Sequence, residues 1–231
     1  MKLFSFAYAG GDGHIFYPIA KELKSCNVTM IPFYYKGRGG RLDEGNYESI
    51  MEMAIEAAHF IQKHEVTDGY ALLGHSMGSI VAYECFYELK RRGFQLPSAI
   101  YFAGSMPPDQ LIQNRFVLDD DEAFIDKLKE LGGLDLEILE VPEFRSFFLP
   151  IIQNDIKNFQ EYVFEEKDEK ITIPVTILTG SFDQVSGEKV SGWKNHSSME
   201  PSFIELDGDH FFLFKGNQNY KAIFKKIITE A

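Results

Sequence analysis

The segment 74–78 reads GHSMG and places Ser76 between two glycines, directly after the apolar run GYALL (69–73). A G-x-S-x-G pattern between a strand and a helix is typical of a nucleophile held on a sharp turn. A strand pattern precedes this serine and a helix pattern follows it. We therefore predict that Ser76 projects from the turn into a cleft as a nucleophile. The alternative is a serine that only caps the following helix.

A serine hydroxyl is a poor nucleophile unless a base takes its proton. Two histidines follow Ser76 in the chain. His210 comes directly after the strand pattern SFIEL (202–206), in the kind of strand-end loop that carries the base behind a serine turn. We therefore predict that His210 is the base. His196 lies near a helix end and is expected to be a surface residue.

An acidic residue must hold the base in the correct tautomer and stabilise the imidazolium as it forms. Asp183 follows the strand pattern PVTILTG (174–180) and is the predicted acid. Asp207 and Asp209 are alternatives. Both are so near His210 in sequence that they could not readily approach its ring from the far side, and a polar turn explains them equally well.

Acyl transfer also needs N–H donors for a developing oxyanion. The N–H of Met77, just after the nucleophile, is one candidate. The loop YAGGDGH (8–14) should supply the second from Ala9, because Gly10 and Gly11 let the backbone approach a substrate. The alternative is a plain glycine turn. Nucleotide binding is disfavoured, since the loop lacks G-x-G-x-x-G spacing and no P-loop lysine follows.

These residues need elements to position them, and the chain alternates strand and helix patterns. Strand patterns occupy 2–8, 28–33, 69–74, 98–104, 174–180 and 202–206, and helix patterns occupy 14–24, 47–64, 78–93, 186–195 and 218–230. Short apolar strands that alternate with helices indicate a parallel sheet covered on both faces. The predicted fold is therefore α/β, with a mostly parallel central sheet of the α/β-hydrolase kind.

The alternation breaks between about residues 107 and 170, where apolar residues recur at helical spacing. We predict a helical lid inserted between two sheet strands, within a single domain that spans residues 1–231. The alternative is an independent helical subdomain with no role at the site.

Composition narrows the class of protein. A net charge of −12 in 231 residues argues against nucleic acids and anionic membrane surfaces as partners. The chain has no apolar run of about 18 residues that could span a membrane, and its first residues do not fit a signal peptide. Cys26 and Cys85 match no disulfide or metal pattern. We therefore expect a cytoplasmic protein that needs no metal or other cofactor.

Five motifs taken together resemble a known family, and they run from the first strand pattern to the last helix pattern. They are AYAGGDG (7–13), PFYYKGRGGR (32–41), GHSMGSIVAYE (74–84), TGSFDQVSGEKVSGW (179–193) and DGDHFFL (207–213). The set resembles the type II (external) thioesterases of nonribosomal peptide and polyketide synthetases, which belong to the α/β-hydrolase superfamily.

The resemblance implies hydrolysis of acyl thioesters from the phosphopantetheine arm of an acyl or peptidyl carrier protein. The family's usual role is editing, in which stalled or wrongly loaded acyl groups are removed so that the synthetase restarts. The resemblance places the nucleophile, acid and base at Ser76, Asp183 and His210, and the oxyanion donors at Ala9 and Met77.

The helical stretch matches the family's lid, with one departure. The family usually has an arginine before an Ala-Asp pair, whereas LPIIQND (149–155) has Gln153 and Asn154 before Asp155. This departure leaves the lid contacts and the acyl preference open.

Arg38 and Arg41, in the loop GRGGR (37–41), are candidates for the site entrance and for contact with an acidic carrier protein. A monomer is expected. Three alternatives stay open at this point. They are a medium-chain acyl-carrier-protein thioesterase that controls product release, a general carboxylesterase, and a non-catalytic binding protein on a hydrolase scaffold.

Overall fold

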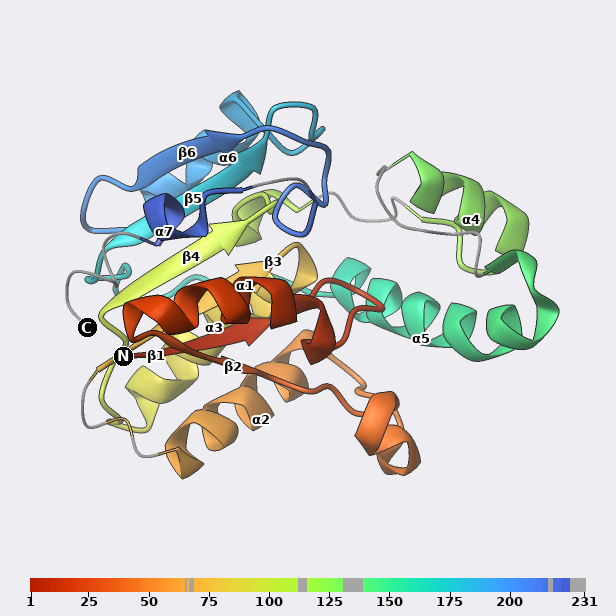
Figure 1. Ribbon diagram of the computed structural model, residues 1–231, viewed down its shortest axis with the longest axis horizontal. Helices are drawn as coiled ribbons and strands as arrows, with labels where there is room; N and C mark the ends of the chain where they lie inside the picture. Colours follow the sequence, from red (N-terminus) through yellow and green to blue (C-terminus); the bar gives the residue numbers. More distant parts are fainter. Residues whose placement is uncertain (65, 67–68, 112–115, 131–138, 216–217, 225–231) are drawn as a thin grey trace.

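A six-stranded parallel sheet forms the centre of the protein (Figure 1). The computed structural model describes residues 1–231 except 65, 67–68, 112–115, 131–138, 216–217 and 225–231. The strands are β1 (Lys2–Phe6), β2 (Thr29–Pro32), β3 (Tyr70–His75), β4 (Ala99–Ala103), β5 (Val175–Gly180) and β6 (Ser202–Leu206). Their order is β2-β1-β3-β4-β5-β6, and every neighbouring pair is parallel. This confirms the predicted fold class.

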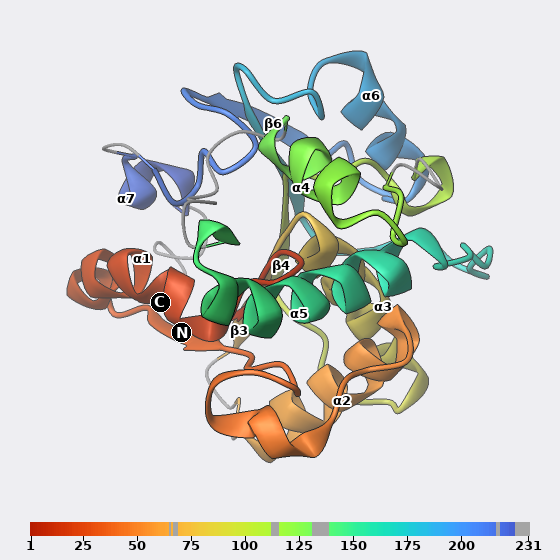
Figure 2. The same cartoon turned by 90° about the vertical axis from the view of Figure 1, so that its right-hand side faces the viewer.

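Helices cover both faces of the sheet. The α-helices are α1 (Tyr17–Leu23), α2 (Ile50–Lys63), α3 (Met77–Arg91), α4 (Asp121–Lys129), α5 (Pro142–Gln160), α6 (Glu188–Ser191) and α7 (Tyr220–Ile223). Short 3-10 helices occupy Gly13–Phe16, Lys24–Cys26, Gly39–Glu44, Pro108–Gln110 and Gly192–Asn195. Figure 2 shows α1 and α7 on one side of the sheet and α2, α3 and α6 on the other.

Burial on both faces explains the unbroken apolar strand sequences. Every residue of β3, β4 and β5 is buried, whereas the edge strand β6 alternates between half-buried and exposed residues. α3, which packs against β3, has buried residues along nearly its whole length, from Met77 to Leu89. Ser49 caps the start of α2, because its hydroxyl accepts the N–H of Glu52 at 3.1 Å.

The sheet topology fixes where a ligand can bind. Strand order reverses between β1 and β3, so the loops that follow these two strands leave in opposite directions. In open parallel sheets a crevice forms at the carboxyl ends of the strands at such a point. Ala9 follows β1 and Ser76 follows β3, so the topology brings both candidate residues to this crevice.

The predicted helical stretch contains α4 and α5, which lie together beyond the carboxyl ends of the strands (Figures 1 and 2). It has a small apolar core of its own, made by Phe116, Phe124, Ile125, Leu128, Leu139, Leu149, Ile152 and Ile156. The side chains of Asn154 and Asn158 both donate to the carbonyl of Tyr47, at 3.1 and 2.8 Å. These bonds fasten the second half of α5 to the body of the protein.

Two stretches of the expected lid, 112–115 and 131–138, and the last six residues (225–230) of the closing helix expected over 218–230 lie outside the described residues. Within the described part of the chain, no helix combines the length and apolar character that crossing a membrane requires.

Candidate active site

Ser76 occupies a strained turn between β3 and α3. Its backbone has φ 54° and ψ −119°, a conformation that costs a non-glycine residue about 1–3 kcal/mol. Its N–H donates to the carbonyl of Ala103 at 2.7 Å, which ties the turn to β4. A Cβ on Gly78 would lie 2.2 Å from the carbonyl oxygen of Phe6, and one on Gly74 would lie 2.2 Å from that of Gly78. The flanking glycines therefore allow α3 to approach the strands closely.

Ser76, His210 and Asp183 form one hydrogen-bonded chain. The hydroxyl of Ser76 lies 3.0 Å from Nε2 of His210, and Nδ1 of His210 lies 3.0 and 3.2 Å from the carboxylate oxygens of Asp183. The Asp183 side chain is 1% exposed and also accepts the N–H of Val185 at 2.9 Å. This geometry suits proton transfer from the serine hydroxyl to the histidine while the carboxylate orients the ring.

The alternative acids are engaged elsewhere. Asp209 accepts the N–H of Phe211 at 2.8 Å, and an Asp207 oxygen lies 3.5 Å from the hydroxyl of Ser181. Of the three aspartates considered from the sequence, the structure brings Asp183 to the His210 ring.

The expectation that His196 is a surface residue is wrong. Its ring is buried, with Nε2 2.7 Å from a carboxylate oxygen of Asp109 and Nδ1 3.3 Å from the hydroxyl of Tyr83. The reason is that the 3-10 helix before it packs inward through Trp193, whose indole stacks on Phe102 of β4.

The two predicted oxyanion donors lie beside the serine. Ala9 and Met77 both line the pocket that contains Ser76 and His210. Met77 is the first residue of α3, so its N–H has no intrahelical acceptor. Ala9 belongs to a tight turn in which Gly11 N–H donates to the carbonyl of Tyr8 at 2.8 Å. The arrangement is suited to attack on a carbonyl carbon with stabilisation of the resulting oxyanion.

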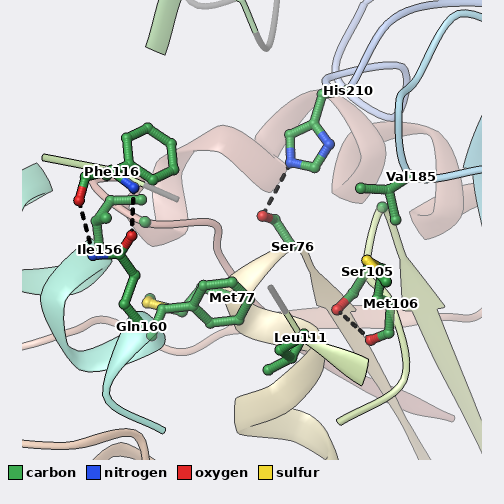
Figure 3. Close-up of a pocket in the computed structure, with 13 residues that line it drawn as sticks. Ser76, Met77, Ser105, Met106, Leu111, Phe116, Ile156, Gln160, Val185 and His210 are labelled. Carbon is green, nitrogen blue, oxygen red and sulfur yellow. Dashed lines mark hydrogen bonds between the residues drawn. The ribbon is translucent and has the colours of Figure 1, made fainter. Parts of the chain in front are cut away.

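The pocket is lined mainly by apolar side chains that the sequence did not single out individually, and several of them belong to the predicted helical stretch (Figure 3). Ile156, Phe159 and Gln160 come from α5, and the amide of Gln160 bonds to the backbone N–H and carbonyl of Phe116 at 2.5 and 3.3 Å. Ser105 and Met106 line the other side, after β4. The helical spacing of the α5 residues was the only sequence signal for this wall.

His75, next to the nucleophile, has no part in the hydrogen-bonded chain. Its ring lies 5.4 Å from that of His210, between centroids. Burial, and secondarily the charge of His210, lowers the pKa of His75 well below its ordinary value of 6.5. A neutral His75 therefore adds no positive charge beside the base.

Replacing His75 with phenylalanine is expected to make unfolding less sensitive to acid. Below about pH 6.5 the unfolded chain protonates His75 but the folded protein does not, so the free energy of unfolding falls as pH falls, by at most about 1.4 kcal/mol per pH unit. Above that pH the residue is neutral in both states and adds no slope. Urea unfolding at a series of pH values measures the difference. Equal slopes in wild type and His75→Phe would contradict the assignment.

The prediction that Arg38 contacts a carrier protein is wrong, because its side chain is only 6% exposed and forms a bidentate ion pair with Asp155. Arg41 is partly exposed, but its guanidinium pairs with Glu44 and Glu56. A contact between Arg41 and a carrier protein stays a prediction.

The two residues that depart from the lid pattern make specific contacts. Gln153 donates to a carboxylate oxygen of Asp121 at 2.8 Å, which joins α5 to the start of α4. Asn154 donates to the body of the protein, as described above. Neither residue lines the pocket, so the departure affects how the helices are held.

Among the residues that the structure describes, no three histidine, cysteine or acidic side chains come together in a way that could hold a metal ion.

Comparisons of the sequence with known proteins match it to thioesterases. A sequence model of the thioesterase domain family matches residues 1–230. The chain is 29% identical to thioesterase PikA5 of Streptomyces venezuelae over 218 residues, which are 92% of this chain and 75% of that protein.

Solved structures show the same similarity. The RedJ thioesterase from the prodiginine pathway of Streptomyces coelicolor superposes with a TM-score of 0.87 at 30% identity, over 100% of this chain and 85% of that one. YbtT, a type II thioesterase from the yersiniabactin NRPS/PKS pathway, gives 0.83 at 26% identity, over 99% and 92%.

Proposed function

This chain belongs to the thioesterase domain family, and we propose that it hydrolyses acyl thioesters carried on the phosphopantetheine arm of a carrier protein. We further propose that it is a type II editing thioesterase, which clears stalled or wrongly loaded acyl groups from a nonribosomal peptide or polyketide synthetase. The observation that carries the proposal is the hydrogen-bonded chain of Ser76, His210 and Asp183 at the apolar pocket. The similarity to YbtT, whose name places it in an NRPS/PKS pathway, and to RedJ, a thioesterase of a prodiginine pathway, supports the choice of substrate.

The geometry supports a reaction in two steps. In the first, Ser76 attacks the thioester carbon while His210 takes its proton, and the N–H groups of Ala9 and Met77 stabilise the oxyanion. The C–S bond then breaks, and His210 returns the proton to the departing thiol. This step leaves an acyl group on the serine oxygen and frees the pantetheine thiol.

In the second step water attacks the acyl-serine ester, and His210 takes the proton from the water. A second oxyanion forms at the same two donors and collapses, the serine oxygen leaves, and His210 reprotonates it. The net reaction consumes one thioester and one water and yields one carboxylic acid and one thiol.

The size of the pocket favours editing of short acyl groups over release of medium chains. Its cavity volume is about 70 Å³, and one water-sized group needs roughly 10–15 Å³ measured in the same way. A chain of a few carbons therefore fits, whereas a chain of ten or more carbons exceeds this volume. Phe116 and Gln160, joined to each other, close one side of this space.

We expect kcat/KM for acetyl and butyryl carrier proteins to exceed that for the dodecanoyl carrier protein by at least about tenfold. Intact-protein mass spectrometry, which resolves the acyl and free forms of the carrier, measures the rate of release. A series of acyl groups on one carrier protein keeps the protein contacts constant.

Each outcome of this series bears on the proposal. Faster release of dodecanoyl than of acetyl groups would favour the medium-chain alternative. Hydrolysis of simple oxygen esters with no turnover of any loaded carrier would identify a carboxylesterase instead. Failure of a fluorophosphonate to label Ser76, with no turnover of either substrate, would leave only the binding-protein alternative.

A further inference from the structure

A buried carboxylate on α5 lies outside the serine–histidine–aspartate chain and joins three distant segments. Asp155 is 0% exposed. Arg38 donates from Nη2 to Oδ1 at 2.7 Å and from Nη1 to Oδ2 at 2.6 Å, and the N–H of Gly10 donates to Oδ2 at 2.8 Å. The loop after β1, the loop after β2 and the second half of α5 therefore meet at one carboxylate.

Stability alone does not account for this ion pair. Removing a carboxylate and a guanidinium from water costs several kcal/mol per ion, and well-packed apolar residues often stabilise a protein as well as such a pair does. A bidentate pair between a guanidinium and a carboxylate does fix the relative orientation of the two groups closely. The pair of Arg38 and Asp155 is therefore suited to orienting what it touches, which is the loop after β1.

Two peptide groups of that loop are held by the pair. The loop is a turn closed by the bond from Gly11 N–H to the Tyr8 carbonyl, and Gly10 has the φ of +79° that a type II turn requires. Asp155 accepts the N–H of Gly10, and Nη1 of Arg38 donates to the carbonyl of Gly11 at 2.9 Å.

The same face of α5 also packs on the loop. A Cβ on Gly10 would lie 2.5 Å from Cγ1 of Ile152, and Ile152 is three residues before Asp155, on the same side of the helix. Ala9, the proposed oxyanion donor, immediately precedes Gly10. Movement of α5 relative to the sheet would therefore disturb the peptide unit that adjoins the donor.

We propose that Asp155 is a positioning residue, which together with Arg38 aligns the Ala9 N–H with the oxyanion and so links the docking of α5 to catalysis. This inference rests on the proposed thioesterase function and adds a residue to its machinery. Asp155 does not line the pocket, so it acts through the loop and not on the substrate.

The Asp155→Asn variant tests this idea with the least change in shape. Both carboxylate oxygens of Asp155 accept hydrogen bonds from Arg38 or Gly10. In the variant an NH2 group takes the place of one of these oxygens and can only donate, so the contacts cannot all form. Removal of an oxyanion donor costs about 10²–10³ in kcat, and misalignment should cost less, about 10- to 100-fold. KM should change by less than about threefold, because the substrate contacts remain. The measurement is steady-state hydrolysis of an acetyl carrier protein.

A trifluoromethyl ketone analogue of acyl-pantetheine measures oxyanion stabilisation directly. Its affinity should not change if Asp155 has only a structural role. It forms a hemiketal with Ser76 whose oxygen occupies the oxyanion position. Its affinity should fall in Asp155→Asn by the same factor as kcat, while the affinity of an unreactive thioether analogue stays within about threefold. The bound ¹⁹F resonance should titrate at higher pH in the variant, since the oxyanion is less stabilised.

Asn154→Ala is the matched control. It removes one of the two bonds that α5 makes to the Tyr47 carbonyl without touching the loop after β1, and the bond from Asn158 still holds α5 in place. We expect kcat within about threefold of wild type even if the protein unfolds at lower urea concentration. Arg38→Lys is the second test, because it keeps the charge but loses the bidentate contact, and its kcat should fall as in Asp155→Asn.

Wild-type kcat in both Asp155→Asn and Arg38→Lys would overturn the inference, and so would equal losses in Asn154→Ala and Asp155→Asn. Either result would leave the proposed function intact as long as the wild-type protein hydrolyses the carrier thioester. Absence of hydrolysis by the wild type would instead contradict the proposed function itself.

Discussion

Replacement of Ser76 with alanine is expected to lower kcat/KM for release of acetyl groups from a carrier protein by at least about 10⁴-fold. The variant keeps the pocket, the base and the oxyanion donors, but it has no oxygen to carry the acyl group. What activity remains must come from direct attack of water at the polarised thioester. Release of labelled acetate measures the loss, and a fluorophosphonate should label wild type at Ser76 and leave the variant unlabelled.

Ser79→Ala is the control for this experiment. Ser79 lies one turn further along α3, and its hydroxyl donates to the carbonyls of Gly74 and Ala103 at 2.9 and 3.1 Å. Its loss should lower the free energy of unfolding by about 1–3 kcal/mol, with activity within about tenfold of wild type. Full activity of Ser76→Ala would exclude Ser76 as the nucleophile.

The strain at Ser76 is consistent with a functional role. A serine with φ 54° gains nothing for stability from this conformation. The bond from its N–H to the Ala103 carbonyl and the close packing at Gly78 hold it there. These contacts therefore offset the backbone strain at Ser76 and keep its hydroxyl directed at His210.

The sheet and the serine turn could be predicted from the sequence because their signals are local. Each of the six strand patterns overlaps one observed strand, and Ser76 lies between β3 and α3 as its flanking patterns indicate. The meeting of acid and base could be predicted because the carboxyl ends of parallel strands gather at one edge of the sheet. That rule brought Asp183 and His210 to the same place.

The contacts of the inserted helices could not be predicted in this way. Arg38 is a candidate for contact with an acidic carrier protein on the basis of its charge alone, yet its partner in the structure lies 117 residues away on α5. No periodicity links two such positions, and only the packing of α5 against the strand ends brings them together. His196 was misassigned for the same reason, since its burial depends on Asp109 after β4.

The structure therefore places two kinds of residue around one reaction. The proton-transfer residues follow sheet strands and were visible in the sequence. One wall of the pocket and the carboxylate that accepts the Gly10 N–H come from α5, whose position depends on polar contacts such as that of Asn158 with Tyr47. We therefore propose that selectivity and oxyanion alignment depend on the position of this helix, whereas the positions of Ser76 and His210 do not.

Replacement of Asp183 with asparagine is expected to lower kcat by about 10³–10⁴-fold with little change in KM. The carboxylate accepts the N–H at Nδ1 of His210 and so leaves Nε2 free to take the serine proton. An asparagine amide can donate to Nδ1 instead, which favours the tautomer with its proton on Nε2. That tautomer cannot act as a base toward Ser76. Steady-state hydrolysis of the acetyl carrier protein separates kcat from KM.

Asp209→Asn is the matched control, because it makes the same chemical change next to His210 in sequence. Its carboxylate accepts the N–H of Phe211 and is not part of the hydrogen-bonded chain of Ser76, His210 and Asp183. Activity should therefore stay within about tenfold of wild type. An equal loss in both variants would mean that contact with the His210 ring does not identify the catalytic acid. A loss confined to Asp183→Asn would show that the acid acts through its contact with Nδ1 of His210, since Asp209→Asn removes the same charge from the loop that carries His210.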